Sequence, residues 1–133
     1  MSERTVIRTP HAPSAFGPFS QGIEMDGWVF TSGQLPLDPA TGQLVAGDIQ
    51  AQTRRVIANL EAILVRGGAS LADVVKATVF ITDMRDFDAV NRVYAEYFPE
   101  QPPARSCIEV PALAKGAQVE IEAIARRRER TAV

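Results

Sequence analysis

The sequence predicts an α/β (α+β) fold, a single two-layer domain over residues 1–133 with two helices on one face of a mixed sheet of about six strands. Three observations predict it. The run 74–81 is almost continuously apolar and β-branched, which is typical of a central strand covered on both faces. Two segments, one before and one after this run, repeat apolar residues at helical spacing. Finally, each predicted helix links strands, which favours one sheet.

The N-terminal part of the chain predicts a short strand, an ordered loop and a hairpin. Residues 5–7 form the first strand, and the loop 11–21 follows it. Phe16 and Phe19 would be unusual in a solvated loop, so we expect it to pack over the core or a ligand cleft. Asp26-Gly27 separates two apolar runs, 22–25 and 28–32, which is a strong signal for a tight hairpin.

Two amphipathic helices follow. Asp48 is expected to cap a helix that runs to about Arg66 and ends at Gly67-Gly68. Its apolar positions form one stripe: Ile49, Val56, Leu60, Ile63 and Leu64. Either Asp83 or Asp86 begins the second helix, and Pro99 ends it.

The final strands are predicted over residues 105–110 and 118–125. Because both helices would pack on one face, the other face has no cover from this chain. We therefore expect association through that face, as a cyclic homo-oligomer. Residues 126–133 are basic, and a solvated, frayed tail is the simplest interpretation of them.

Composition excludes several classes of partner. The net charge of −2 offers no electrostatic case for nucleic acid. One cysteine, Cys107, rules out an internal disulfide, and with His11 as the single histidine a zinc site is unsupported. Neither a signal peptide nor an apolar run of membrane-spanning length is present. We therefore expect a cytoplasmic protein with no membrane partner.

Arg105 is the first candidate functional residue. It follows Pro102-Pro103, at the start of a predicted strand. A guanidinium held there is suited to grip a carboxylate with two parallel hydrogen bonds. We hypothesise that it anchors a small carboxylate-bearing substrate. The alternative is that it pairs with one of the chain's own acids or lies in water.

Other candidates depend on their neighbours. Strand alternation places Cys107 on the same face as Arg105, where it is either a small cavity-lining residue or a thiolate whose pKa the arginine lowers. Glu120 and Glu122 share a face of the last strand. One of them could lie near Arg105 if the last two strands are neighbours, and would then activate a water or form an internal ion pair. No sequence cue pairs His11 with Cys107.

The motifs in combination resemble the RidA (YjgF) family of reactive intermediate deaminases. They are Gly17-Pro18-Phe19-Ser20-Gln21, Thr31-Ser32-Gly33-Gln34, Thr78-Val79-Phe80 with Asp86-Phe87, Val90-Asn91 and Tyr94, Pro103-Ala104-Arg105-Ser106-Cys107, and the run 119–125. They span nearly the whole chain.

The resemblance implies a chorismate-mutase-like fold and a homotrimer with a cleft between each two subunits. It implies hydrolysis of 2-imino acids, the tautomers of 2-aminoacrylate and 2-aminocrotonate, without a metal or organic cofactor. By position, Arg105 would bind the substrate carboxylate, Cys107 would line the cleft and Glu120 would place the water. Ser32 and Gly33 of the adjoining subunit, with Phe19 and Phe87, would complete the substrate site.

One position departs from the family pattern: Phe19 stands where the resemblance implies a tyrosine. The ring remains available for packing, but a hydroxyl and one hydrogen bond are lost. Two functions therefore compete, imine deamination and non-catalytic binding of a small metabolite in the same cleft. A holdase or translation-inhibiting role, also attached to the family, finds no support beyond the basic tail.

Overall fold

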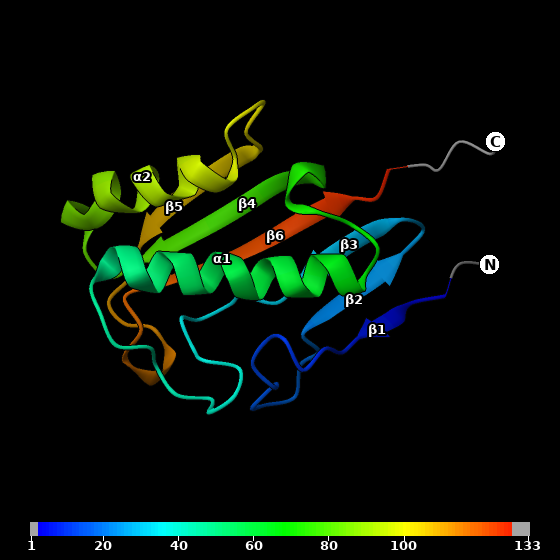
Figure 1. Cartoon of the computed structure of the whole chain (residues 1–133), viewed down its shortest axis with the longest axis horizontal. Coiled ribbons are helices and arrows are strands. Elements are labelled where there is room, and N and C mark those ends of the chain that lie inside the picture. The colour runs from blue at the N-terminus through cyan, green and yellow to red at the C-terminus, as the bar shows by residue number, and fades with distance from the viewer. Residues whose placement is uncertain (1–2, 129–133) are drawn as a thin grey trace.

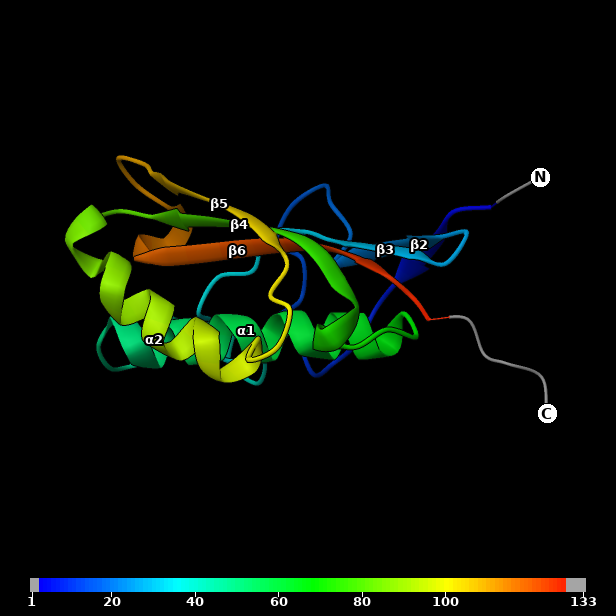
Figure 2. The same ribbon diagram turned by 90° about the horizontal axis from the view of Figure 1, so that it is seen from above.

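The computed structural model describes residues 3–128 and has two layers, a sheet and a pair of helices. The strands are β1 (Thr5–Ile7), β2 (Gly22–Met25), β3 (Trp28–Thr31), β4 (Val74–Ile81), β5 (Ala104–Glu109) and β6 (Val119–Arg126). The helices are α1 (Ile49–Arg66) and α2 (Phe87–Tyr97). Figure 2 shows both helices on one side of the sheet, so the predicted fold class is confirmed.

The sheet order is β1-β2-β3-β6-β4-β5, and β4 pairs with β5 in parallel while every other pair is antiparallel. The last strand therefore enters the middle of the sheet, between β3 and β4. At the hairpin between β2 and β3, Asp26 and Gly27 both have positive φ, 53° and 84°. This is the tight turn that the dipeptide predicts.

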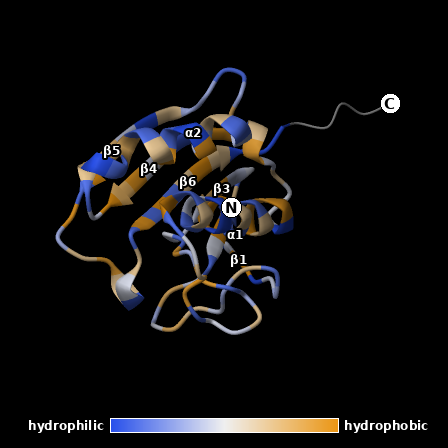
Figure 3. Ribbon diagram, turned by 60° about the vertical axis from the view of Figure 1, so that its left-hand side comes forward, coloured by the Kyte–Doolittle hydropathy of each residue, from blue (hydrophilic) through white to orange (hydrophobic). Residues whose placement is uncertain are grey.

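Helix α1 begins and ends at the predicted residues. Asp48 accepts a hydrogen bond from the backbone N–H of Ala51 at 3.0 Å, and Gly67 forms the C-cap. The predicted stripe faces the sheet, with Val56, Leu60 and Ile63 at most 1% exposed. Figure 3 shows the apolar colouring along β4 and β6 that meets this stripe.

Helix α2 begins at Phe87, directly after a 3₁₀ turn (Met84–Asp86). The Asp83 side chain caps that turn by accepting a hydrogen bond from the backbone N–H of Arg85. Asp83 therefore caps the 3₁₀ turn, and α2 follows directly after the turn. None of the helices described over residues 3–128 has the length and hydropathy needed to span a membrane.

The sheet face opposite the helices is uncovered by the described chain. Strand register aligns Val6, Ile23, Phe30 and Ile124 in one row across this face. Phe30 and Val6 are 42% and 44% exposed. Strand β4 is thus buried on the helix side alone within one chain, rather than on both faces. We refer to the uncovered side as the open face.

The predicted tail overlaps described structure at its start. Arg126 is the last residue of β6, and its guanidinium lies over the ring of Trp28. Arg128 pairs with Asp73 at 2.9 Å. Residues 129–133, the rest of the predicted tail, lie outside the described residues.

Candidate functional site

Arg105 lies on the edge strand β5 and its side chain turns toward α2. Its pairing with Ala77 places it on the helix side of the sheet. Its Cζ lies 5.6 Å from the ring centroid of Phe87 and 4.8 Å from that of Tyr94. Within residues 3–128 no acid forms an ion pair with it. The structure thus favours a cation held by aromatic faces over one neutralised by the chain's own carboxylates.

Cys107 lies on the same side as Arg105, as alternation predicts, and pairs with Val79 of β4. It is half-buried and packs against the hydrophobic core. Burial raises the pKa of its thiol, and the opposing effect of Arg105 is smaller. A thiol with a raised pKa stays protonated at neutral pH, so the geometry favours a lining residue over a thiolate nucleophile.

Glu120 lies on the open face, where β6 pairs it with Phe80 of β4. A methyl group added at Gly33 would lie 2.0 Å from the Glu120 Oε2 atom, so the loop and the carboxylate are in close contact. Two backbone hydrogen bonds between Gln34 and Ile121, of 2.8 and 3.2 Å, hold that loop against β6. Glycine at position 33 is what permits this approach.

Ser32 and Phe19 belong to the same neighbourhood as Gly33. The Ser32 hydroxyl donates to the carbonyl of Ser20, which joins the loop after β3 to the loop before β2. Phe19 and Gly33 line one small cavity. Phe16 meets the Phe19 ring edge-on, with centroids 5.5 Å apart, so the aromatic loop packs beside this cavity as expected.

The predicted site residues therefore form two groups. The first, which we call the arginine group, contains Arg105, Cys107 and Phe87 on the helix side of the sheet. The second, the glutamate group, contains Phe19, Ser32, Gly33 and Glu120 on the open face.

The expectation that Glu120 or Glu122 could lie near Arg105 is wrong within one chain. It required β5 and β6 to be neighbours, but β4 lies between them. Strand alternation also turns Glu120 and Arg105 to opposite faces, since Phe80 and Ala77 are three residues apart on β4. One protomer does not bring the two groups together.

The electrostatics of the glutamate group suit a proton acceptor. Burial, and secondarily the like charge of Glu122, raise the pKa of the Glu120 carboxyl. A raised pKa makes the ionised carboxylate a stronger base toward a bound water than an exposed glutamate is.

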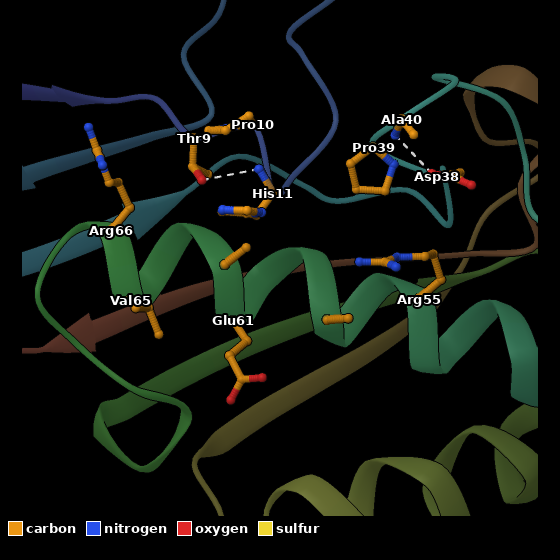
Figure 4. A pocket seen from close by; sticks show the side chains of 12 residues that line it. Thr9, Pro10, His11, Asp38, Pro39, Ala40, Arg55, Glu61, Val65 and Arg66 are labelled. Atoms are coloured by element: carbon orange, nitrogen blue, oxygen red, sulfur yellow. Dashed lines mark hydrogen bonds between the residues drawn. The ribbon is translucent and has the colours of Figure 1, made fainter.

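A groove of about 1180 Å³ lies elsewhere, between α1 and the segments around Thr9 and Asp38 (Figure 4). It holds His11, whose backbone N–H donates to the Thr9 hydroxyl at 3.2 Å. His11 follows β1 at one edge of the sheet, whereas Cys107 lies on β5 at the other. A His–Cys pair is therefore not formed within this protomer.

Sequence reasoning placed Tyr94 on the apolar stripe of α2 and among the motif residues of the family resemblance, but gave it no role in the site. Its ring nevertheless lies closer to Arg105 than that of Phe87 does. The available signal was the spacing, because residues seven apart on a helix share a face. That face meets β5 only once the packing of α2 is known.

Comparison with known proteins gives a consistent result. The model of the family described as Endoribonuclease L-PSP matches residues 9–127. A RutC family protein of Pyrococcus abyssi is 52% identical over 122 residues, which cover 92% of this chain and 96% of that protein. The 2-iminobutanoate/2-iminopropanoate deaminase of Capra hircus is 48% identical over 122 residues, 92% of this chain and 89% of that protein.

Among solved structures, Escherichia coli TdcF with bound serine superposes with a TM-score of 0.88 at 47% identity, covering 93% of this chain and 99% of that one. At 47% identity, the similarity to this structure includes the sequence as well as the fold.

Proposed function

Because the chain belongs to the Endoribonuclease L-PSP family, the family of RidA and YjgF, we propose that it hydrolyses reactive 2-imino acids to 2-keto acids and ammonia. The substrates we propose are 2-iminopropanoate and 2-iminobutanoate, the tautomers of 2-aminoacrylate and 2-aminocrotonate. The similarity to a deaminase of this specificity supports the proposal. The observation that carries it is the half-buried Arg105, whose guanidinium lies over the rings of Phe87 and Tyr94 with no acid of residues 3–128 paired to it.

The proposed mechanism needs few groups. Arg105 binds the substrate carboxylate through its fork of N–H donors, which fixes the position of the adjacent imine carbon. Glu120 accepts a proton from a water as that water adds to the carbon of the C=N bond. Glu120 returns that proton to the nitrogen, the added hydroxyl passes its own proton to the same nitrogen as the C–N bond breaks, and a keto acid and ammonia leave. The imine is electrophilic already, so a protonated Cys107 thiol suffices as a lining group.

The placement of the two groups supports a site shared between protomers. We propose that a homotrimer joins the arginine group of one protomer to the glutamate group of the next. The apolar row on the open face supports an oligomer, because an exposed apolar patch of this kind is typical of interfaces. Bound serine in TdcF, a ligand with an amino-acid carboxylate, supports a small carboxylate in the cleft here.

The proposal is tested by generating 2-aminocrotonate with a dehydratase or an amino-acid oxidase and following imine loss. We expect the wild-type chain to accelerate hydrolysis and Arg105→Ala to lower kcat/KM by about 100-fold, because a bidentate charge-assisted contact is removed. Arg54→Ala is the matched control. It removes an arginine that pairs with Glu96 between α1 and α2, and it should leave the rate unchanged.

A wild-type rate equal to that in buffer would refute the enzyme and favour the second candidate, a non-catalytic metabolite-binding trimer. Binding of a keto acid without turnover would identify that case. The endoribonuclease named by the family description finds no electrostatic support here, since the net charge is −2.

A further inference from the structure

Tyr94 is a buried aromatic residue beside Arg105 that the proposed mechanism does not use. It lies on α2 seven residues after Phe87 and is 6% exposed. Its ring centroid is 4.8 Å from the Arg105 Cζ atom, within the range of a cation–π contact. On its other side Tyr94 rests against Phe98, with ring centroids 4.5 Å apart and a tilt of 31°.

The hydroxyl of Tyr94 does not explain its presence. It is buried and has no hydrogen-bond partner among residues 3–128. Burial raises the pKa of the phenol, with a smaller opposing effect from Arg105, so the group is neutral rather than a phenolate paired with the guanidinium. The contact between Tyr94 and Arg105 therefore runs through the face of the ring.

Arg105 needs such support because of its position. It lies on the edge strand, where a long flexible side chain has β4 on one side and no strand on the other. No acid of the described residues holds its guanidinium. A guanidinium that stacks flat on an aromatic ring keeps its N–H donors in the plane, pointing outward from the edge of the stack.

We propose that Tyr94 is the positioning residue for Arg105. Its ring sets the plane of the guanidinium so that two N–H donors are aligned for the substrate carboxylate, and Phe98 holds the ring in place. This inference rests on the proposed function. It assigns to Tyr94 a role in binding the carboxylate through Arg105, with no contact to the substrate.

The test measures binding of 2-oxobutanoate by calorimetry and steady-state imine hydrolysis for a set of variants. Tyr94→Leu removes the ring and Tyr94→Phe keeps it. Val93→Ala is the matched control, a fully buried residue of the same helix that carries no ring. We expect Tyr94→Leu to weaken keto-acid binding and raise KM by about tenfold with a much smaller change in kcat. Tyr94→Phe and Val93→Ala should stay within about twofold of wild type.

A double-mutant cycle shows whether Tyr94 acts through the arginine. In the Arg105→Ala background, Tyr94→Leu should change kcat/KM by less than about twofold, because the group it positions is gone. If Tyr94→Leu is unstable, Tyr94→Met replaces it, since methionine fills core gaps without a flat ring.

The failures are distinguishable. If Arg105→Ala weakens binding but Tyr94→Leu does not, or if Tyr94→Phe is as impaired as Tyr94→Leu, the role of Tyr94 is overturned and the proposed function stands. Equal losses from Tyr94→Leu in both backgrounds would also overturn it. If Arg105→Ala binds and turns over like wild type, the proposed site itself is refuted.

Discussion

Glu120 and Glu122 lie two residues apart on β6 and share the open face. Burial is the larger cause of the raised pKa of Glu120, and the charge of Glu122 adds to it. A glutamate with a raised pKa takes up its proton at a higher pH than an exposed one. If ionised Glu120 holds the water, kcat/KM falls as the pH drops through that raised pKa.

Glu122→Gln removes the like charge and should lower the pKa of Glu120. The acidic limb of the kcat/KM profile then moves to lower pH, so the variant keeps more activity than wild type in mildly acidic buffer. The measurement is the imine assay across pH, with Glu61→Gln on α1 as a control of equal charge change. An unchanged limb, or one that moves to higher pH, would contradict the role of Glu120 as the base.

At the scale of elements, the glutamate group depends on how the loop after β3 docks on β6. The reciprocal hydrogen bonds between Gln34 and Ile121 bring Gly33 against the Glu120 carboxylate. The atom that a methyl group at Gly33 would meet is the far end of a flexible side chain. A methyl group added at Gly22 would instead lie 2.7 Å from Ile63 Cγ2 and 3.0 Å from the backbone carbonyl oxygen of Phe30. Glycine is thus required at position 33 to leave room for the Glu120 carboxylate, and at position 22 to leave room for the packed core and backbone.

Gly33→Ala should displace the Glu120 carboxylate and lower kcat/KM by about tenfold or more, because the base no longer holds its water in place. Its melting temperature should stay close to wild type, since the carboxylate can move. Gly22→Ala is the contrasting variant and should destabilise the fold by about 1–3 kcal/mol through overpacking. Thermal unfolding and the imine assay together separate the two. Full activity in Gly33→Ala would mean that the position of Glu120 is unimportant.

At the scale of the whole molecule, the sheet separates the two groups of site residues. Arg105 faces the helices and Glu120 faces away from them, so the site that we propose requires a second protomer. Mixed assemblies test this directly. Arg105→Ala and Glu120→Gln should each be inactive alone. Refolded together in equal amounts, they should regain about a quarter of wild-type activity, because each mixed trimer contains one intact cleft.

The control for this experiment is a mixture of the separately folded variants that have not exchanged subunits, which should remain inactive. Sedimentation or light scattering of the same samples gives the oligomeric state. If activity does not recover in an assembly verified to be a mixed trimer, the two residues do not serve one shared cleft.

Short-range signals account for the accuracy of the predicted elements. The turn and the helix caps form at Asp26-Gly27, Asp48 and Gly67-Gly68. Their backbone geometry depends on residues close by in the sequence. The observed strands and helices consequently begin and end within a residue or two of the predicted positions. The final strands shift by one, to Ala104–Glu109 and Val119–Arg126.

The candidate site residues could be named from the sequence, but their grouping in space could not be predicted. The roles of Arg105, Cys107, Glu120 and Phe87 remain proposals, and the structure supplies their neighbours. Tyr94 was missed because helical spacing shows which residues share a face but not which strand that face meets. Glu120 was expected near Arg105 because the order of the strands was unknown.

Periodicity, turn dipeptides and caps act over a few residues, so the chain alone specifies its elements, its fold class and the uncovered side of the sheet. The insertion of β6 between β3 and β4 was decided only in three dimensions, because strand order depends on contacts between segments nearly a hundred residues apart. The insertion separates β6 from β5, and the register on β4 turns Glu120 and Arg105 to opposite faces, so the proposed cleft is a property of two chains. The packing of α2 over β5, which places Tyr94 beside Arg105, was likewise decided in three dimensions.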